Sequence, residues 1–173
     1  TPRAPASSLS EAVPNLVVYH PPCLIVGIGC NRGTPAGEIR DAVNATLAAA
    51  GLAAESVYLT ATVEDKADEP GLLAACREAG WRLQAISRAD LVAAGDPPNP
   101  SPYAMAALGI PGVAEPAAQL AASGPGGPAA LLVQKQKFPN VTVAVAQAPV
   151  ENWNPLTGRT VMIEQDGMSG GAA

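Results

Sequence analysis

The sequence predicts a three-layer α/β/α sandwich, built on a mixed sheet of about five strands with a C-terminal β-hairpin. Apolar runs of strand length alternate with stretches of helical periodicity, which is typical of parallel strands covered by helices on both faces. Two further strand-like runs flank the turn letters FPN near the end of the chain, and this pattern is typical of an antiparallel hairpin.

Length and composition are consistent with one such domain between two irregular ends. The chain has 173 residues with an apolar share of 48%, which is enough for a single core. We divide it into an N-terminal arm or linker over residues 1–22, an α/β domain over 23–148 and a C-terminal tail over 149–173.

The same composition excludes several classes of partner. Aromatic residues make up 3% of the chain, which argues against a stacking platform for single-stranded nucleic acid. The net charge of −5 argues against broad contact with a phosphate backbone. No apolar stretch is long enough to cross a bilayer, and the first residues lack the apolar core of a signal peptide. We therefore expect a cytoplasmic protein with no nucleic-acid and no membrane partner.

The first strand and the first helix surround a glycine-rich turn. The letters CLIVGIG, residues 23–29, form a continuous apolar run and predict a strand that is buried on both faces. Thr34 is a good N-cap and Pro35 is tolerated at the first helical position, so a helix is predicted to begin there. Gly51 is predicted to end this helix.

The remaining elements follow from the same two periodicities and from capping residues. Pro70 is accepted only in a first helical turn. Ser87 and Asp90 form a capping box, and Ser101 caps a further short helix. In chain order these elements are a strand over 56–63, a helix over 70–80, a strand over 82–86, short helices over 87–95 and 101–109, a helix over 112–123 and the hairpin over 129–148.

The glycine-rich turn, GIGCNRGT, is close to a dinucleotide-binding fingerprint but departs from it. Its glycines are Gly27, Gly29 and Gly33, a spacing one residue longer than G-x-G-x-x-G. The acid expected after the second strand would be Glu64 or Asp65, well beyond the usual separation of about 20 residues. A dinucleotide-binding oxidoreductase is therefore disfavoured, and the glycines have the alternative role of letting the strand pack closely and turn.

The same turn also suits a carboxylate. The free N–H groups at the start of the helix after Pro35 point toward it, and Arg32 adds a permanent cation with a forked set of donors. Such a turn can hold a carboxylate without any nucleotide. The alternative for Arg32 is a solvated turn residue with no ligand.

Five motifs extend through the chain and are considered together. They are GIGCNRGT (27–34), TVEDKADEPGL (62–72), NPSP (99–102), GVAEPAAQLAAS (112–123) and LLVQKQKFPNVTVAVA (131–146). In this order and spacing they resemble the CobE / CbiG C-terminal domain family of cobalamin (vitamin B12) biosynthesis. The resemblance covers about residues 23–148 and leaves out the arm and the tail.

The resemblance implies a role in building the corrin ring, with a precorrin or cobalt-precorrin intermediate as the ligand. CbiG proteins of the anaerobic route act as cobalt-precorrin-5A hydrolases, which open a δ-lactone and release acetaldehyde. They carry an additional N-terminal domain, for which these residues show no counterpart. CobE, the stand-alone form of the aerobic route, has no assigned reaction. The chain is then either part of a hydrolase or a non-catalytic module for tetrapyrrole binding and handover, with an N-terminal CbiG-type domain or other corrin-pathway enzymes as partners.

A basic rim would suit such a macrocycle, which is edged with acetate and propionate groups. The loops that leave the carboxyl ends of parallel strands lie along one edge of a sheet. Arg32 follows the first strand and Lys66 the second. Lys135 and Lys137 reach the same edge if the first hairpin strand runs parallel to those two. The predicted ligand-binding residues are Gly29, Cys30, Asn31, Arg32, Gly33, Thr34, Lys66, Glu69, Ser101, Glu115 and Lys135.

Two acids are candidates for catalysis, each with a structural alternative. Glu115 would be a general base for lactone hydrolysis if burial raised its pKa, and is otherwise a helix-start acid favoured by the helix dipole. Glu69 lies three residues after Lys66. These two side chains either line the cleft or form a surface ion pair, worth about 0–1 kcal/mol. The alternative for the two hairpin lysines is that they are simply polar strand ends.

No metal or cofactor site is predicted. His20 is the only histidine, and Cys23, Cys30 and Cys76 form no CxxC pair, so reduced thiols are expected. Any cobalt would arrive with the substrate. Cys30 lies where a helix N-terminus would lower a thiol pKa, yet no His–Cys pair is identifiable, so a small packed residue is favoured over a nucleophile.

Overall fold

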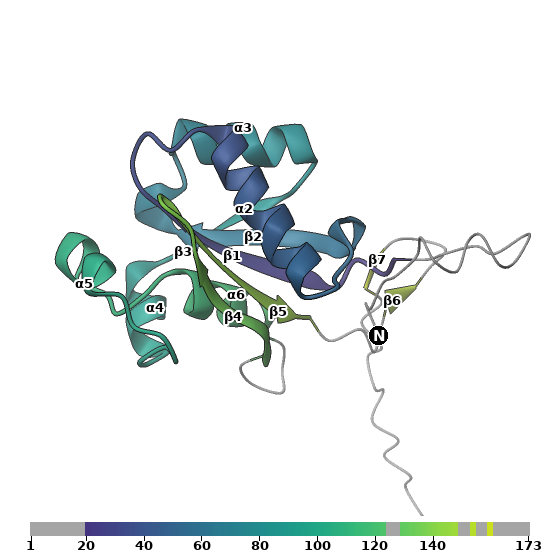
Figure 1. The fold of residues 1–173 in the computed structure, drawn as a ribbon. Helices are drawn as coiled ribbons and strands as arrows, with labels where there is room; N and C mark the ends of the chain where they lie inside the picture. Colours follow the sequence, from purple (N-terminus) through teal and green to yellow (C-terminus); the bar gives the residue numbers. More distant parts are fainter. Residues whose placement is uncertain (1–19, 124–128, 149–152, 155–158, 161–173) are drawn as a thin grey trace, which may run out of the picture.

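The computed structural model describes residues 20–123, 129–148, 153–154 and 159–160 of the chain (Figure 1). In chain order its elements are β1 (Leu24–Cys30), α2 (Ala36–Ala49), η1 (Ala54–Ser56), β2 (Val57–Val63), η2 (Glu64–Lys66), α3 (Pro70–Ala79), β3 (Leu83–Ile86), α4 (Arg88–Ala93), α5 (Pro102–Leu108), α6 (Ala114–Ala122), β4 (Leu131–Lys137), β5 (Val141–Gln147), β6 (Trp153–Asn154) and β7 (Arg159–Thr160). From β1 to β5, the order of strands and α-helices agrees with the elements predicted from the sequence.

The main sheet contains five strands in the order β3-β2-β1-β5-β4. β1 is parallel to β2 and β2 is parallel to β3, whereas β5 runs antiparallel to both β1 and β4. β4 therefore runs in the same direction as β1, and its carboxyl end lies at the same edge as the ends of β1, β2 and β3. The predicted mixed sheet with a C-terminal hairpin is confirmed, as is the strand direction on which the position of the hairpin lysines depended.

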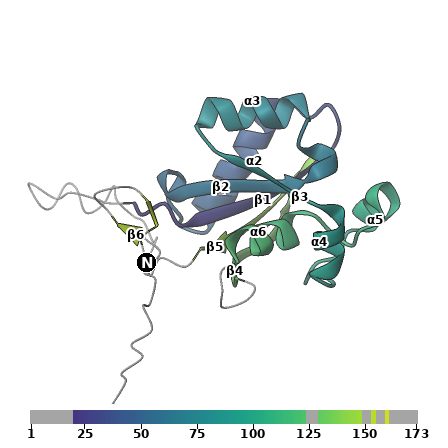
Figure 2. The same ribbon diagram turned by 180° about the vertical axis from the view of Figure 1, so that it is seen from behind.

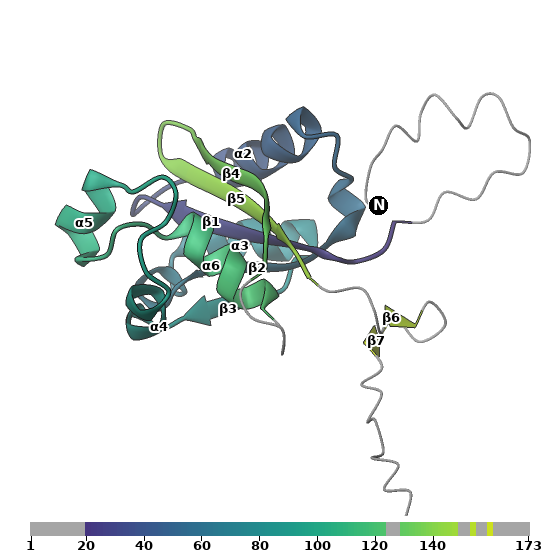
Figure 3. The same cartoon turned by 90° about the horizontal axis from the view of Figure 1, so that it is seen from below.

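Helices cover both faces of the sheet, which confirms the three-layer arrangement (Figures 1 and 2). α2 and α3 pack together on one face, over a core that includes Leu24, Val26 and Ile39. α6 lies across the other face, in contact with α4. α5 stands beyond the carboxyl ends of the strands, away from both helical layers (Figure 3).

α6 approaches β1 closely because Gly27 has no side chain. A Cβ atom placed on Gly27 would lie 1.8 Å from the backbone oxygen of Ala114. The buried face of α6 also contains small residues, among them Ala117 and Ala118. The close packing considered for this glycine from the sequence is therefore its role in the structure.

The turn after β1 differs from its prediction in one detail. The prediction that Thr34 is the N-cap is wrong, because α2 begins at Ala36 and Pro35 occupies the N-cap position. The hydroxyl of Thr34 donates instead to the backbone oxygen of Asn31 at 2.8 Å. Because this hydrogen bond closes the turn on itself, the hydroxyl is not available to the helix.

The other predicted caps are confirmed. Ser87 accepts the backbone N–H of Asp90 at 3.1 Å, and Ser101 accepts the backbone N–H of Ala104 at 3.2 Å. Pro70 is the first residue of α3, as its sequence position required. These caps fix where α4 and α5 begin.

The two predicted end segments lie mostly outside the described residues. Of the arm over 1–22 the structure describes residues 20–22, and of the tail over 149–173 it describes β6 and β7, which pair antiparallel. None of the helices in the described ranges is long and apolar enough to cross a membrane.

Gly27→Ala is expected to lower the free energy of unfolding by about 3 kcal/mol, because the added methyl group collides with the backbone of α6 rather than with a movable side chain. Gly37→Ala, in α2, is the matched control, since its Cβ would meet no atom within 4 Å. That control is expected to raise stability by about 0.4–1 kcal/mol. Urea denaturation measures both changes, and a wild-type midpoint for Gly27→Ala would contradict the close contact.

Candidate functional site

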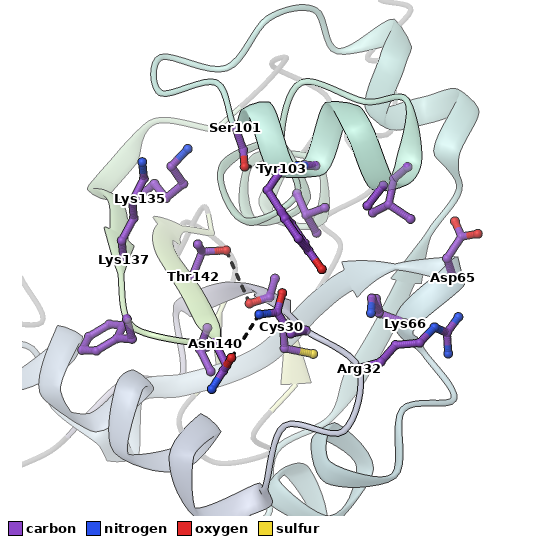
Figure 4. Close-up of a pocket in the computed structure, with 18 of the residues that line it drawn as sticks. Cys30, Arg32, Asp65, Lys66, Ser101, Tyr103, Lys135, Lys137, Asn140 and Thr142 are labelled. Carbon is purple, nitrogen blue, oxygen red and sulfur yellow. Dashed lines mark hydrogen bonds between the residues drawn. The ribbon is translucent and has the colours of Figure 1, made fainter.

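A cleft of about 770 Å³ opens where β1 and β2 end and the hairpin turns (Figure 4). Crevices outside the carboxyl ends of parallel strands are the usual ligand sites of open α/β sheets. Its walls come from the turn after β1, the η2 segment, the start of α4, α5 with the loop after it, and the tip of the β4–β5 hairpin. The lining residues are Gly29, Cys30, Asn31, Arg32, Asp65, Lys66, Arg88, Ser101, Pro102, Tyr103, Ala104, Ala107, Leu108, Val113, Lys135, Lys137, Phe138, Pro139, Asn140, Val141 and Thr142.

The cleft is cationic although the chain is acidic. Five of the ten Lys and Arg residues line it, namely Arg32, Lys66, Arg88, Lys135 and Lys137. Of the fifteen Asp and Glu residues, Asp65 is the single acid among its described lining residues. Asp65 is already paired with Arg88, at 2.6 Å between Oδ1 and Nη2. The positive charge of the cleft is therefore carried mainly by the other four cations.

The turn after β1 does hold a carboxylate, and this carboxylate belongs to the chain itself. Glu69 immediately precedes α3, is 4% exposed and accepts the backbone N–H of Gly33 at 2.7 Å. Arg32 lies 3.9 Å from the other carboxylate oxygen, at the limit of an ion pair, and its side chain is 72% exposed. Glu69 thus ties α3 to the turn that presents Arg32, and it does not itself line the cleft.

The same turn is fixed to the tip of the hairpin. Asn31 donates its backbone N–H to the backbone oxygen of Asn140 at 2.9 Å, and its side-chain amide to Oδ1 of Asn140 at 3.1 Å. Glu38 on α2 accepts the backbone N–H and the amide of Asn140, at 3.2 and 3.0 Å. The turn that carries Arg32 and the hairpin turn that follows Lys137 are therefore held together by direct hydrogen bonds.

Glu115 braces the opposite wall from beneath the cleft. It lies in α6, is 1% exposed and does not line the cleft. Its Oε1 accepts the amide of Asn99 at 2.8 Å and the backbone N–H of Lys135 at 2.9 Å, and its Oε2 accepts the backbone N–H of Asn99 at 3.0 Å. The register between β4 and β5 shifts at this place, between Val133 and Gln136, where the N–H of Lys135 turns to Glu115. One carboxylate therefore joins α6, β4 and the loop before α5.

Lys135 connects this brace to the cleft. Its ammonium donates to the backbone oxygen of Asn99, and its side chain lines the cleft. Burial lowers the pKa of Lys135 from its ordinary value, Lys137 lowers it further, and Glu115 raises it. The charged form of Lys135 is therefore disfavoured by burial and by the neighbouring Lys137, and a bound anion would stabilise that charged form.

Cys30 contributes a protonated thiol to the cleft. Burial raises the pKa of this thiol to about 11, while Lys66 acts to lower it and the Glu69 carboxylate to raise it. Its side chain is 8% exposed. Burial therefore outweighs the lowering expected from a helix start, and this agrees with a packed residue rather than a nucleophile.

Seven of the eleven predicted ligand-binding residues line the cleft, namely Gly29, Cys30, Asn31, Arg32, Lys66, Ser101 and Lys135. The other four, Gly33, Thr34, Glu69 and Glu115, are not among its lining residues. Sequence reasoning missed Arg88 and Tyr103. Arg88 follows the third strand, so the rule that selected Arg32 and Lys66 would have selected it too. No signal in the sequence marks Tyr103, because its position depends on the placement of α5.

The fold and the cleft define an α/β domain with a cation-lined, partly apolar crevice at its strand ends. No cluster of three or more His, Cys, Asp or Glu side chains suited to a metal occurs in the part of the chain that the structure describes. Residues 24–146 match the family model described as Cobalamin synthesis G C-terminus. The chain belongs to this family, and the resemblance found in the sequence is confirmed.

Two curated relatives and one solved structure are similar to the chain. The cobalt-precorrin-5A hydrolase of Priestia megaterium is 38% identical over 137 residues, which are 79% of this chain and 35% of that protein. Protein CobE of Sinorhizobium sp is 38% identical over 124 residues, covering 71% of this chain and 79% of that protein. The crystal structure of CobE, a protein from the cobalamin (vitamin B12) biosynthetic pathway, matches with a TM-score of 0.68 and 30% identity, over 76% of this chain and 95% of that one.

These findings give a general function. The chain is a cobalamin-biosynthesis protein of the CobE and CbiG C-terminal type. It spans about a third of the length of the Priestia megaterium hydrolase, since 35% of that protein is covered.

Glu115→Ala is expected to lower the free energy of unfolding by about 3 kcal/mol, because three partly buried N–H donors lose their shared, buried and charged acceptor. Glu78→Ala is the control, because Glu78 is half-exposed in an ion pair with Arg40 at 3.1 Å. Loss of this ion pair is expected to lower the free energy of unfolding by less than about 1 kcal/mol. Urea denaturation compares the two variants, and equally small losses would show that Glu115 is not a brace.

The raised pKa of Cys30 predicts slow alkylation of the native protein. A thiol with a pKa of about 11 holds roughly a hundredfold less thiolate at pH 8 than one with its ordinary pKa of 9.0. The rate of Cys30 modification by iodoacetamide should therefore keep rising through pH 9 and level off only near pH 11. In the chain unfolded in urea, the rate of Cys30 modification should level off near pH 9, the ordinary pKa of the thiol. Mass spectrometry of the peptide resolves Cys30, and a native plateau at or below pH 9 would contradict the prediction.

Proposed function

We propose that the cleft binds a precorrin or cobalt-precorrin intermediate, and that the chain serves corrin-ring biosynthesis through this binding. The single observation that carries the proposal is the gathering of five cations around one cleft of an acidic chain. A corrin intermediate is edged with acetate and propionate groups, which pair with such cations. Membership of the cobalamin-synthesis family supports the same class of ligand.

The spacing of the cations favours a wide ligand. Lys66 follows β2 and Lys137 ends β4, and these strands are separated in the sheet by β1 and β5. Three steps between neighbouring strands correspond to about 14 Å. One carboxylate cannot contact cations at both ends of such a span, whereas a macrocycle with carboxylates on opposite edges can.

Apolar surface between the cations favours the same kind of ligand. Leu108, Val113, Phe138 and Val141 line the cleft together with the lysines. Val113 and Val141 are buried, but Leu108 and Phe138 are partly exposed, and a small hydrophilic polyanion would leave them in contact with water. The face of a macrocycle would cover these side chains, and that burial adds a favourable free energy in proportion to the apolar area.

The proposal assigns binding rather than bond cleavage to the described residues. The two catalytic candidates, Glu69 and Glu115, are buried and accept backbone N–H groups. Asp65, which does line the cleft, is paired with Arg88. We therefore favour a module that binds a labile tetrapyrrole and hands it to other corrin-pathway enzymes. Cobalt, where present, arrives within the substrate.

The similarity to the hydrolase favours a second candidate function. In this version the domain holds cobalt-precorrin-5A while its δ-lactone is opened and acetaldehyde is released. The reacting groups would come from another domain, such as the N-terminal domain of CbiG-type proteins. Acetaldehyde release from cobalt-precorrin-5A by the purified chain alone would instead locate the reaction in these residues.

Titration with cobyrinic acid, a corrin polycarboxylate, tests the proposed function, and Arg32→Ala is expected to weaken binding about tenfold or more. The reason is that a hydrogen bond between charged groups is worth roughly 1.5–3 kcal/mol. Arg32→Lys is expected to restore binding only in part, because lysine cannot form the bidentate fork. The melting temperature should barely change, since the Arg32 side chain is 72% exposed. The corrin absorbance spectrum reports binding.

Arg77→Ala is the matched control, because Arg77 is an exposed cation of α3 that does not line the cleft. It should leave the affinity unchanged. An equal loss in Arg77→Ala and Arg32→Ala would mean that net charge alone is responsible. Unchanged affinity in both Arg32 variants would remove Arg32 from the site. A wild-type protein that binds NAD tightly and gives no corrin response would overturn the proposed function.

A further inference from the structure

We propose that Tyr103 determines the specificity of the cleft, by laying its phenol ring against the face of a macrocycle that carries carboxylates on two opposite edges. The inference rests on the proposed function, since both concern the same cleft. It adds a requirement that the cations alone do not impose, namely a ligand with a broad ring face between its charged edges.

The exposure of Tyr103 has no explanation in the packing of the fold. Its relative exposure is 66%, the highest among the large apolar side chains of the described residues. Ala104 is the single buried residue of α5. The chain has only six aromatic residues, and one of them places an exposed ring in this cleft. An aromatic ring left in water gains free energy when an apolar ligand face covers it.

The segment that carries this ring is anchored rather than loose. Ser101 caps α5 through the N–H of Ala104, and its own backbone N–H donates to the oxygen of Pro111 at 2.6 Å. Two residues earlier, Asn99 is held by the buried carboxylate of Glu115. The segment before α5 is therefore fixed at two points, to Glu115 of α6 through Asn99 and to the loop after α5 through Ser101. A ring on a fixed support contacts a ligand with little loss of conformational entropy.

The ring projects into the middle of the cleft. Figure 4 shows Tyr103 extending from α5 into the space between Lys135 and Lys137 on one side and Arg32 and Lys66 on the other. The sheet order gives the same arrangement, because β4 and β2 lie on opposite sides of β1 and β5. A ligand that reaches both groups of cations must pass across the ring.

This geometry distinguishes ligands of equal charge by their shape. A macrocycle places carboxylates on both groups of cations and its face on the ring at the same time. A flexible chain of carboxylates reaches the cations but offers no face to Tyr103. The cations therefore set the charge of the ligand, while Tyr103 selects for a broad ring between its charged edges.

Titration of uroporphyrin, a flat porphyrin polycarboxylate, tests this inference through the shift of its absorbance band. Tyr103→Ala is expected to weaken binding about tenfold, because the ring contact is lost. Tyr103→Phe keeps the ring and is expected to stay within about twofold of wild type. Met105→Ala is the matched control: Met105 lies on the same helix and is 50% exposed, but does not line the cleft, so binding should be unchanged.

The dependence of affinity on salt separates a ring contact from a structural effect. The slope of log Kd against log salt reports the charge contacts, so it should be the same in Tyr103→Ala and wild type. A changed slope would show that the variant disturbs the cation rim and would overturn the inference. So would wild-type affinity in Tyr103→Ala, or an equal loss in Tyr103→Phe. If wild type fails to bind uroporphyrin and cobyrinic acid, the proposed function fails and the inference fails with it; binding that ignores Tyr103 removes the inference alone.

Discussion

The carboxylate of Glu115 is the interaction on which the rest of the cleft depends. It joins α6 to β4 and to the loop that leads to α5, so these two parts of the cleft wall are fixed to one helix. α6 in turn lies against β1 at the close contact allowed by Gly27. A buried carboxylate shared by three donors is hard to replace, since the donors would lose a charged acceptor in a partly buried region. Glu115 therefore fixes the relative positions of α6, β4 and the segment before α5.

Two buried acids support two cations that line the cleft. Glu69 holds the turn that presents Arg32, and Glu115 holds the strand that presents Lys135. Neither acid lines the cleft, and each accepts backbone N–H groups. Their effect on a ligand is thus indirect, through the direction in which the cations point. Acids of this kind are easily taken for general bases when residue type alone is considered.

Periodicity and capping predicted the fold well, because both act over short stretches of chain. The strands, the order of the helices and the basic edge of the sheet all followed from such patterns, together with the rule for the ends of parallel strands. The burial of Glu69 and Glu115 was not predictable in this way, since their partners lie 16 to 36 residues away in the chain. Thr34 failed as a cap for a different, local reason, because its hydroxyl donates to the backbone oxygen of Asn31 and closes the turn. Tyr103 depends on the position of a whole helix, which no local signal encodes.

The irregular register of β4 has a consequence for how the molecule behaves among its own copies. β4 is an edge strand, and an edge strand with free N–H and C=O groups can recruit a strand from another chain and begin aggregation. Here the shift between Val133 and Gln136, together with the charges of Lys135 and Lys137, disrupts the regular row of groups that a second strand would need. The same two lysines line the cleft. Replacement of these two lysines by uncharged residues, for example to suit a less acidic ligand, would therefore also make it easier for β4 to pair with another copy of the chain.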